Sequence, residues 1–334
     1  MKISSALPAS HPSPVARKPV EPAPLGQPVA DMVACSQLAT AGLLYRAGGA
    51  EAQSWMAKRP PLQDVPLVKM DRPYMMVPGW TTRPEKFEAL VSRLTEGGRN
   101  GGQAYYVRDG EFFADGAMTQ PLKTVPSDAR LFVQVFHHTL QPPSETAPQL
   151  ERSIAAIQKA TGSEKVDVEG YSMGGLATRV FLDQGGQGVG KVMLLGVPNR
   201  GSRFSELSQR VIQRDIGWAM RLANLTVADL PAMSWLAAGA NPHLADLNSR
   251  WEQQVARTEG LKIVGSAELP TPSAGGFPLR KGDGMVETRS LTMPGVEVEI
   301  LRGRPTLQHG ALPSDSDVYR ERAEFFGWAP EDPA

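Results

Sequence analysis

The sequence is poor in cysteine and lacks long apolar runs. Cys35 is the single cysteine among 334 residues. One cysteine excludes a disulfide framework within the chain, and we expect its thiol to act as a small apolar packing group. No apolar run approaches the roughly 18 residues that a membrane-spanning helix needs. The composition therefore predicts neither a disulfide scaffold nor a membrane span.

The N-terminal region lacks the features of a targeting signal. Seven prolines fall within the first 28 residues, and the apolar segment of a secretory signal is missing. Few of these residues could pack into a core. We predict a disordered tail at 1–29 and a cytoplasmic protein, and export by a route without a cleaved signal stays open.

The chain also lacks an excess of charge of either sign. Lysine plus arginine and aspartate plus glutamate number 35 each, so the formal net charge is zero. This balance gives no indication of a nucleic-acid partner or of binding to an anionic membrane surface. Because 41% of the residues are hydrophobic, a sizeable core can form, and we expect one domain over 30–330.

Extended and helical patterns alternate through most of the chain. Strand patterns occur at 74–80, 130–138, 165–170, 191–198, 261–267 and 296–303, and helical patterns at 84–94, 150–160 and 316–328. Such alternation predicts an α/β protein with a mainly parallel sheet and helices on both faces.

Three segments depart from this alternation. Residues 31–58 predict an irregular helix that Gly48 and Gly49 interrupt, and 102–116 an extra hairpin. Residues 201–257 predict several helices with no strand between them, which forms a helical insertion in the α/β domain.

A serine stands at a sharp corner in the stretch "VDVEGYSMGG". A strand pattern ends there, a helix pattern begins, and Gly170 and Gly174 flank Ser172. Side chains larger than glycine at these two positions would collide with the nucleophile of such a turn or with its neighbours. The amides at the helix N-terminus can stabilise developing negative charge. The corner predicts Ser172 as a nucleophile at the carboxyl edge of the sheet.

A serine nucleophile needs a base, and on this architecture the expected chain order is serine, acid, histidine. Among the five histidines, His309 in "LQHGAL" follows the last strand pattern, where a loop could return it to Ser172. The other four lie in the tail, before the serine or within the inserted helices: His11, His137, His138 and His243.

The candidate acid is Asp283, in the flexible Gly-Asp-Gly loop of "KGDGMVETR". Its carboxylate could accept the Nδ1 hydrogen of His309 and stabilise the imidazolium. Glu287 and Glu268 are the competing acids.

An oxyanion needs two N–H donors aimed at one point. Met173, directly after the serine, would supply one donor. Trp80 in "VPGWTT", after Gly79, would supply the other.

With these residues assembled, the sequence resembles the α/β-hydrolase superfamily, and more narrowly bacterial lipases and esterases of the triacylglycerol-lipase type. The phrases "KVDVEGYSMGG", "LLGVPNRGS", "GDGMV" and "HGAL" carry the resemblance, which spans roughly 70–312. It implies a Ser172–His309–Asp283 triad that hydrolyses carboxylic esters through an acyl-enzyme. Two positions depart from the family pattern, because Pro78 and Tyr171 stand where histidine is common.

The inserted helices at 201–257 occupy the position of a lipase cap or lid. Their apolar side chains either pack on the sheet or form an acyl-binding wall, and the sequence leaves both open. The residues concerned are Phe204, Leu207, Val211, Ile212, Trp218, Met220, Leu222, Leu225, Trp235, Leu236 and Trp251.

The expected function is hydrolysis of esters with apolar acyl chains. An acyltransferase, thioesterase or amidase with the same triad stays open, as does a binding module with an inactive site. We expect a small-molecule or lipid ester as substrate and no nucleic acid; lipid-interface contact and oligomeric state stay open.

No cofactor or metal is predicted. We expect His137 and His138 not to bind a metal, Asp315 and Asp317 to cap the last helix rather than bind calcium, and 185–190 to form a loop.

Overall fold

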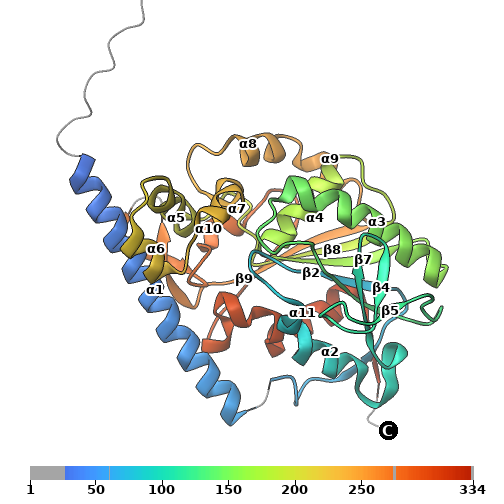
Figure 1. Ribbon diagram of the computed structural model, residues 1–334. Helices are drawn as coiled ribbons and strands as arrows, with labels where there is room; N and C mark the ends of the chain where they lie inside the picture. Colours follow the sequence, from blue (N-terminus) through green and yellow to red (C-terminus); the bar gives the residue numbers. More distant parts are fainter. Residues whose placement is uncertain (1–26, 60, 274–275, 332–334) are drawn as a thin grey trace, which may run out of the picture.

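The computed structural model describes residues 27–59, 61–273 and 276–331 (Figure 1). Within these residues a nine-stranded sheet forms the centre of the molecule. The strands from β12 to β3 are parallel, and β4 and β5 continue the sheet antiparallel. In spatial order they are β12 (Glu297–Leu301), β9 (Gly260–Ser266), β8 (Val189–Leu195), β7 (Val166–Tyr171), β2 (Tyr74–Val77), β6 (Leu131–Gln134), β3 (Ala104–Arg108), β4 (Glu111–Phe113) and β5 (Pro121–Leu122).

Helices cover both faces of this sheet. On one face lie α3 (Pro143–Thr161) and α4 (Met173–Asp183), and on the other α2 (Glu88–Thr95) and α11 (Ser316–Phe326). Successive strand residues alternate between the two cores: Met75 packs on the α3–α4 side and Met76 on the α2–α11 side. The mainly parallel α/β sheet and its six predicted strands are confirmed.

The predicted hairpin at 102–116 is present as β3 and β4. Asp109 and Gly110 join the strands with positive φ angles of 52° and 83°, as the tight turn of a two-residue hairpin requires. This hairpin is part of the main sheet rather than an addition, because β3 also pairs with β6. The sequence did not predict β5 of the main sheet or four strands outside it. These four form two antiparallel pairs, β1 (Leu67–Lys69) with β13 (Ala329–Glu331) and β10 (Leu269–Ser273) with β11 (Gly276–Gly282).

The helix predicted at 31–58 is α1 (Gln27–Lys58), and the predicted interruption at Gly48 and Gly49 is wrong. A Cβ on Gly48 would lie 2.9 Å from Leu269 Cδ1, so this glycine lets the helix pack closely against β10. Cys35 is buried, as expected. Of the predicted tail, residues 1–26 lie outside the described residues, and 27–29 belong to α1.

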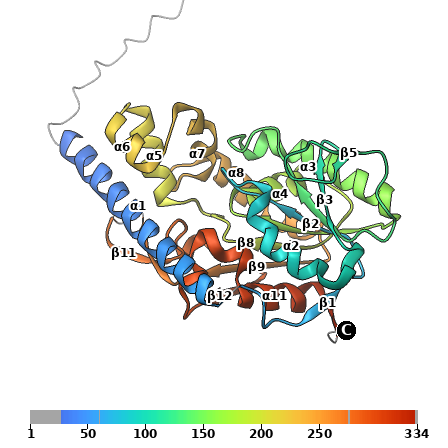
Figure 2. The same ribbon diagram turned by 60° about the horizontal axis from the view of Figure 1, so that its bottom comes forward.

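Residues 201–257 are helical, as predicted, and we call this segment the cap. In the ribbon α1 runs beside the first two cap helices (Figure 2). The cap contains α5 (Arg203–Gln213), α6 (Gly217–Ala223), a 3-10 turn (Val227–Asp229), α7 (Leu230–Leu236), α8 (Pro242–Ser249) and α9 (Trp251–Val255).

Arg179 fastens the cap to α4. Its guanidinium is fully buried and donates to Gln254 Oε1 at 3.0 Å and to Asn248 Oδ1 at 2.7 Å. Another guanidinium nitrogen donates to Asn199 Oδ1 at 3.1 Å, on the segment that follows β8. The cap helices α8 and α9 are therefore hydrogen-bonded to the helix that begins at the serine corner.

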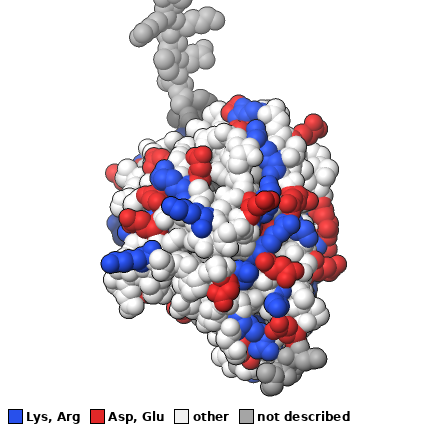
Figure 3. Space-filling view, turned by 90° about the vertical axis from the view of Figure 1, so that its right-hand side faces the viewer, with Lys and Arg blue, Asp and Glu red and all other residues white. Residues whose placement is uncertain are grey.

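Charged groups of both signs are interspersed on the face of the molecule shown in Figure 3. Within the part of the chain that the structure describes, every helix is too short or too polar to cross a membrane.

Candidate active site

Ser172 lies between β7 and α4 with a φ of 53° and a ψ of −125°. A positive φ is uncommon for a residue other than glycine, and the tight packing here enforces it. A Cβ on Gly170 would lie 2.5 Å from Gly175 Cα, and one on Gly174 would lie 2.5 Å from the Pro78 carbonyl oxygen. The expected steric reason for the two flanking glycines is confirmed.

The structure brings Ser172, His309 and Asp283 together. His309 Nε2 lies 3.0 Å from Ser172 Oγ, and its Nδ1 lies 2.7 Å from Asp283 Oδ2. The His309 side chain is 7% exposed and the Asp283 side chain is fully buried. A carboxylate beside Nδ1 holds the proton on that nitrogen, so the Nε2 lone pair faces the hydroxyl.

Asp283 follows β11 directly, and the prediction that its loop is flexible does not fit the contacts. Asp283 Oδ1 accepts hydrogen bonds from the Met285 and Val286 amides at 3.0 and 2.8 Å. Its carbonyl accepts from the His309 amide at 2.8 Å. These bonds fix the Asp283 carboxylate. They also join the Asp283 and His309 segments through the backbone, in addition to the bond between the two side chains. The loop leads into the short helix α10 (Thr288–Leu291).

The two competing acids have other partners. Glu287 accepts from Arg289 Nε at 2.8 Å, and Glu268 accepts from the Gly303 amide at 2.8 Å. Of the three candidate acids, it is Asp283 whose carboxylate is hydrogen-bonded to His309.

Two tyrosines that the sequence does not predict as site residues support this arrangement. Tyr171 donates from its hydroxyl to the His309 carbonyl at 2.9 Å. Tyr45, on α1, packs so closely that a Cβ on Gly310 would lie 2.6 Å from its hydroxyl oxygen. Burial and the charge of Asp283 raise the pKa of Tyr45 to about 12, so this phenol is neutral at physiological pH. Tyr45 is distant in sequence from both segments, and no motif marks it.

The loop after β2 lies against the serine corner. A Cβ on Gly79 would lie 2.7 Å from Ser172 Cβ and 3.3 Å from the Met173 nitrogen. Met173 is the first residue of α4, and the first amides of a helix have no acceptor within the helix. The structure thus places the loop of Trp80 next to Met173, the other predicted donor.

A cleft of about 930 Å³ opens above Ser172 and His309. Its wall is mixed: threonines and charged residues of 81–86 line it together with apolar side chains. The apolar part includes Met56, Trp80, Leu236, Met285 and Val286.

Most of the apolar cap side chains do not reach this cleft. Of the residues predicted as an acyl-binding wall, Leu236 lines it. Trp235 stacks on His243 of α8, with ring centroids 4.6 Å apart, and Trp218 is 54% exposed. The side chain of Leu222 lies outside the described residues. The others are buried in the core: Phe204, Leu207, Val211, Ile212, Met220, Leu225 and Trp251.

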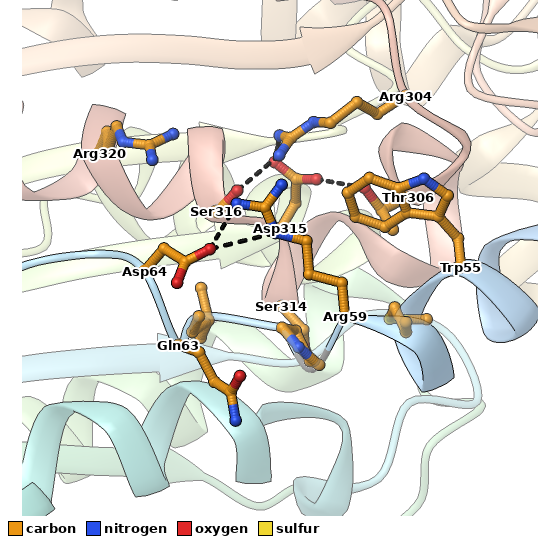
Figure 4. Close-up of a pocket in the computed structure, with 13 residues that line it drawn as sticks. Trp55, Arg59, Gln63, Asp64, Arg304, Thr306, Ser314, Asp315, Ser316 and Arg320 are labelled. Carbon is orange, nitrogen blue, oxygen red and sulfur yellow. Dashed lines mark hydrogen bonds and ion pairs between the residues drawn. The ribbon is translucent and has the colours of Figure 1, made fainter.

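A second pocket, of about 230 Å³, adjoins the cleft through Met56 and Ser314. Figure 4 shows two of its arginines directed at carboxylates: Arg304 binds Asp315 at 2.5 Å, and Arg59 binds Asp64. The third, Arg320, pairs with Asp317 at 2.7 Å. Their charges are already balanced, so we assign no ligand to this pocket.

The residues that were expected not to bind a metal or cofactor make contacts within the protein. Asp315 caps α11 as predicted, accepting from the Asp317 and Val318 amides. Asp317, also predicted to cap, instead lies in the first turn of the helix and pairs with Arg304 and Arg320. His137 contacts the Asp109 carboxylate, which Arg152 also binds. Residues 185–188 form the predicted loop, and 189–190 already belong to β8.

The fold is that of known hydrolases. The structure is similar to Bacillus licheniformis lipase BlEst2 in its propeptide form, with a TM-score of 0.54 and 16% identity over 80% of this chain and 54% of that chain. For the mature form the TM-score is 0.52, with 13% identity over 80% of this chain and 94% of that chain. A Listeria innocua gene product has a TM-score of 0.50 and 18% identity over 76% of this chain and 93% of that chain. The chain has the α/β-hydrolase fold.

Sequence comparison gives shorter matches. No family model matches the chain. Over 73 residues, 22% of this chain, it is 36% identical to a triacylglycerol lipase of Pseudarthrobacter phenanthrenivorans and to one of Burkholderia plantarii. The chain matches about a fifth of the length of these relatives, 23% and 20% respectively. The resemblance to triacylglycerol lipases is therefore local.

Proposed function

We propose that this protein is a serine hydrolase that cleaves carboxylic esters, with Ser172 as nucleophile, His309 as base and Asp283 as the supporting acid. The observation that carries the proposal is the continuous hydrogen-bonded line from Asp283 through His309 to Ser172, at 2.7 and 3.0 Å, at the floor of a cleft. A serine hydroxyl becomes an effective nucleophile when a base oriented in this way can take its proton.

The reaction begins when Ser172 Oγ attacks the acyl carbonyl and His309 Nε2 takes the hydroxyl proton. The buried carboxylate of Asp283 stabilises the imidazolium, and the amides of Met173 and Trp80 donate to the oxyanion. The tetrahedral intermediate expels the alcohol, which receives the proton from His309. Water then attacks the acyl-enzyme with the same base, and the acid is released as Ser172 regains its proton.

We propose esters with apolar acyl groups as substrates. Leu236, Met285 and Val286 offer an apolar surface in the cleft beside Ser172, which suits an acyl chain. The local likeness to triacylglycerol lipases supports the same substrate class. The polar wall along 81–86 suits the hydrated alcohol end of an ester.

The test is hydrolysis of p-nitrophenyl esters by the wild type, Ser172→Ala and the control Ser208→Ala. Ser208 is a buried serine on α5 that donates to the Phe204 carbonyl, away from the cleft. We expect Ser172→Ala to lose a factor of about 10⁴ or more in kcat and to lose fluorophosphonate labelling, while Ser208→Ala retains both. Native turnover by Ser172→Ala would rule out the proposal.

A further inference from the structure

The Trp80 loop has a direct bond to the cap. The indole nitrogen of Trp80 donates to Asp229 Oδ1 at 2.9 Å, across 149 residues of sequence. Asp229 is 3% exposed and lies at the end of the 3-10 turn that leads into α7. A buried carboxylate of the cap therefore binds the residue that we propose as an oxyanion donor.

The same carboxylate is held from the other side. Asp229 Oδ2 accepts from the Thr226 amide at 2.8 Å, as in a capping box, and also from the Thr226 hydroxyl at 2.9 Å. Each oxygen thus has its own partner: one orders the cap turn, and the other reaches the Trp80 indole. Because the Thr226 backbone amide already fixes the carboxylate, the carboxylate can in turn fix the Trp80 indole.

The loop that carries Trp80 has a strained backbone. The Thr82 amide donates to the Gly79 carbonyl at 3.1 Å, which makes Trp80 and Thr81 the central residues of a tight turn. Thr81 has a φ of 54°, which is unfavourable for a β-branched residue. Such a conformation persists when its surroundings hold it. The Thr81 amide is held by the Thr139 carbonyl at 3.1 Å, and the Trp80 side chain by Asp229.

We infer that Asp229 is a positioning residue, which holds the Trp80 turn in the geometry that directs the Trp80 amide at the oxyanion. This inference rests on the proposed function. If Asp229 has this role, the oxyanion site depends on the position of the cap, because the cap supplies the Asp229 carboxylate. Asp229 itself touches neither substrate nor the reacting atoms.

The expected effect is on the transition state more than on substrate binding. Removing an oxyanion donor outright costs about 10²–10³ in kcat. A displaced donor costs less, and we expect Asp229→Ala to lose about 10-fold in kcat with KM changed less than about 3-fold.

The experiment measures kcat and KM for a p-nitrophenyl ester in Asp229→Ala, Trp80→Phe and the double variant, with active sites counted by fluorophosphonate labelling. Counting sites separates a less efficient site from a smaller folded fraction. A trifluoromethyl ketone, whose hemiketal oxyanion imitates the tetrahedral intermediate, should bind both single variants about 10-fold more weakly. The double variant should resemble the single ones, because both remove the same bond.

Thr226→Ala is the matched control. It removes the hydroxyl bond to Asp229 Oδ2 but keeps the Thr226 amide bond that holds the same oxygen and the indole bond to Oδ1, so kcat per active site should stay within about 2-fold of wild type. Equal losses in Thr226→Ala and Asp229→Ala would overturn the inference, because cap stability alone would then explain both. Wild-type kcat in Asp229→Ala, with Ser172→Ala inactive, would also overturn it while the proposed function stands. Activity in Ser172→Ala would reject the proposed function itself.

Discussion

The Tyr171 hydroxyl donates a hydrogen bond to the backbone carbonyl of His309, 2.9 Å away. Tyr171 is the last residue of β7 and directly precedes Ser172, so this bond joins the proposed nucleophile strand to the proposed base segment, 138 residues further along. The tyrosine ring also lies 5.3 Å, centroid to centroid, from the imidazole. The residue that departs from the family pattern thus has a structural role in the site.

Tyr171→Phe is expected to lower both activity and stability. The change leaves the buried His309 carbonyl without this donor, which costs about 1–2 kcal/mol, and it frees the imidazole to shift, so kcat should fall about 3- to 10-fold. Urea unfolding and ester kinetics measure the two effects. The control is Tyr319→Phe, which removes a similar bond from Tyr319 to the Pro66 carbonyl, also 2.9 Å. It should lose stability alone, and an equal loss of kcat would contradict the role of Tyr171.

Asp283→Asn tests the choice of acid. An amide keeps the Oδ1 bonds to the Met285 and Val286 amides but can present an N–H to His309 Nδ1, which favours the wrong tautomer. We expect a loss of about 10³–10⁴ in kcat with little change in unfolding free energy. Glu287→Gln and Glu268→Gln serve as controls and should stay within about 3-fold of wild-type kcat. A larger loss in either control than in Asp283→Asn would point to a different acid.

Much of the fold could be predicted from the sequence, and so could the candidate residues Ser172, Asp283 and His309. These features depend on short contiguous motifs and on the order of residues along the chain. The Ser172 corner is a contiguous motif, and the order of serine, acid and histidine follows from strand topology. The sequence does not predict a role for Tyr45 or Asp229, because each acts through contacts with residues far away in the chain. The continuity of α1 at Gly48 likewise depends on the close packing of Leu269, a tertiary contact that outweighs local helix propensity.

Because the pKa of the Tyr45 phenol is raised, we expect the unfolding free energy to fall at alkaline pH. Burial, with the nearby charge of Asp283, raises the pKa of Tyr45 from 10.0 to about 12. Between these values the unfolded chain loses the proton and the folded protein keeps it, so the unfolding free energy falls as pH rises from 10 to 12. Over this range the wild type should lose on the order of 1–2 kcal/mol more than Tyr45→Phe, which has no ionisable group there. Urea unfolding at pH 9 and 11.5 measures the difference. Equal losses in the two proteins would show that Tyr45 does not titrate in this way.

Gly174→Ala and Gly42→Ala are expected to have opposite effects although both glycines lie in helices. Intrinsic helix propensity favours alanine by about 1 kcal/mol at each position. At Gly42 in α1 a Cβ meets nothing within 4 Å, so the gain should appear in the unfolding free energy. At Gly174 the Cβ would lie 2.5 Å from the Pro78 carbonyl oxygen, and backbone has to move, which costs at least about 1–3 kcal/mol. Because Pro78 leads into the Trp80 loop, kcat per active site should also fall in Gly174→Ala and stay unchanged in Gly42→Ala. Thermal unfolding and ester kinetics on both variants measure whether stability rises in Gly42→Ala and falls in Gly174→Ala. A native kcat in Gly174→Ala would show that the Trp80 loop tolerates displacement.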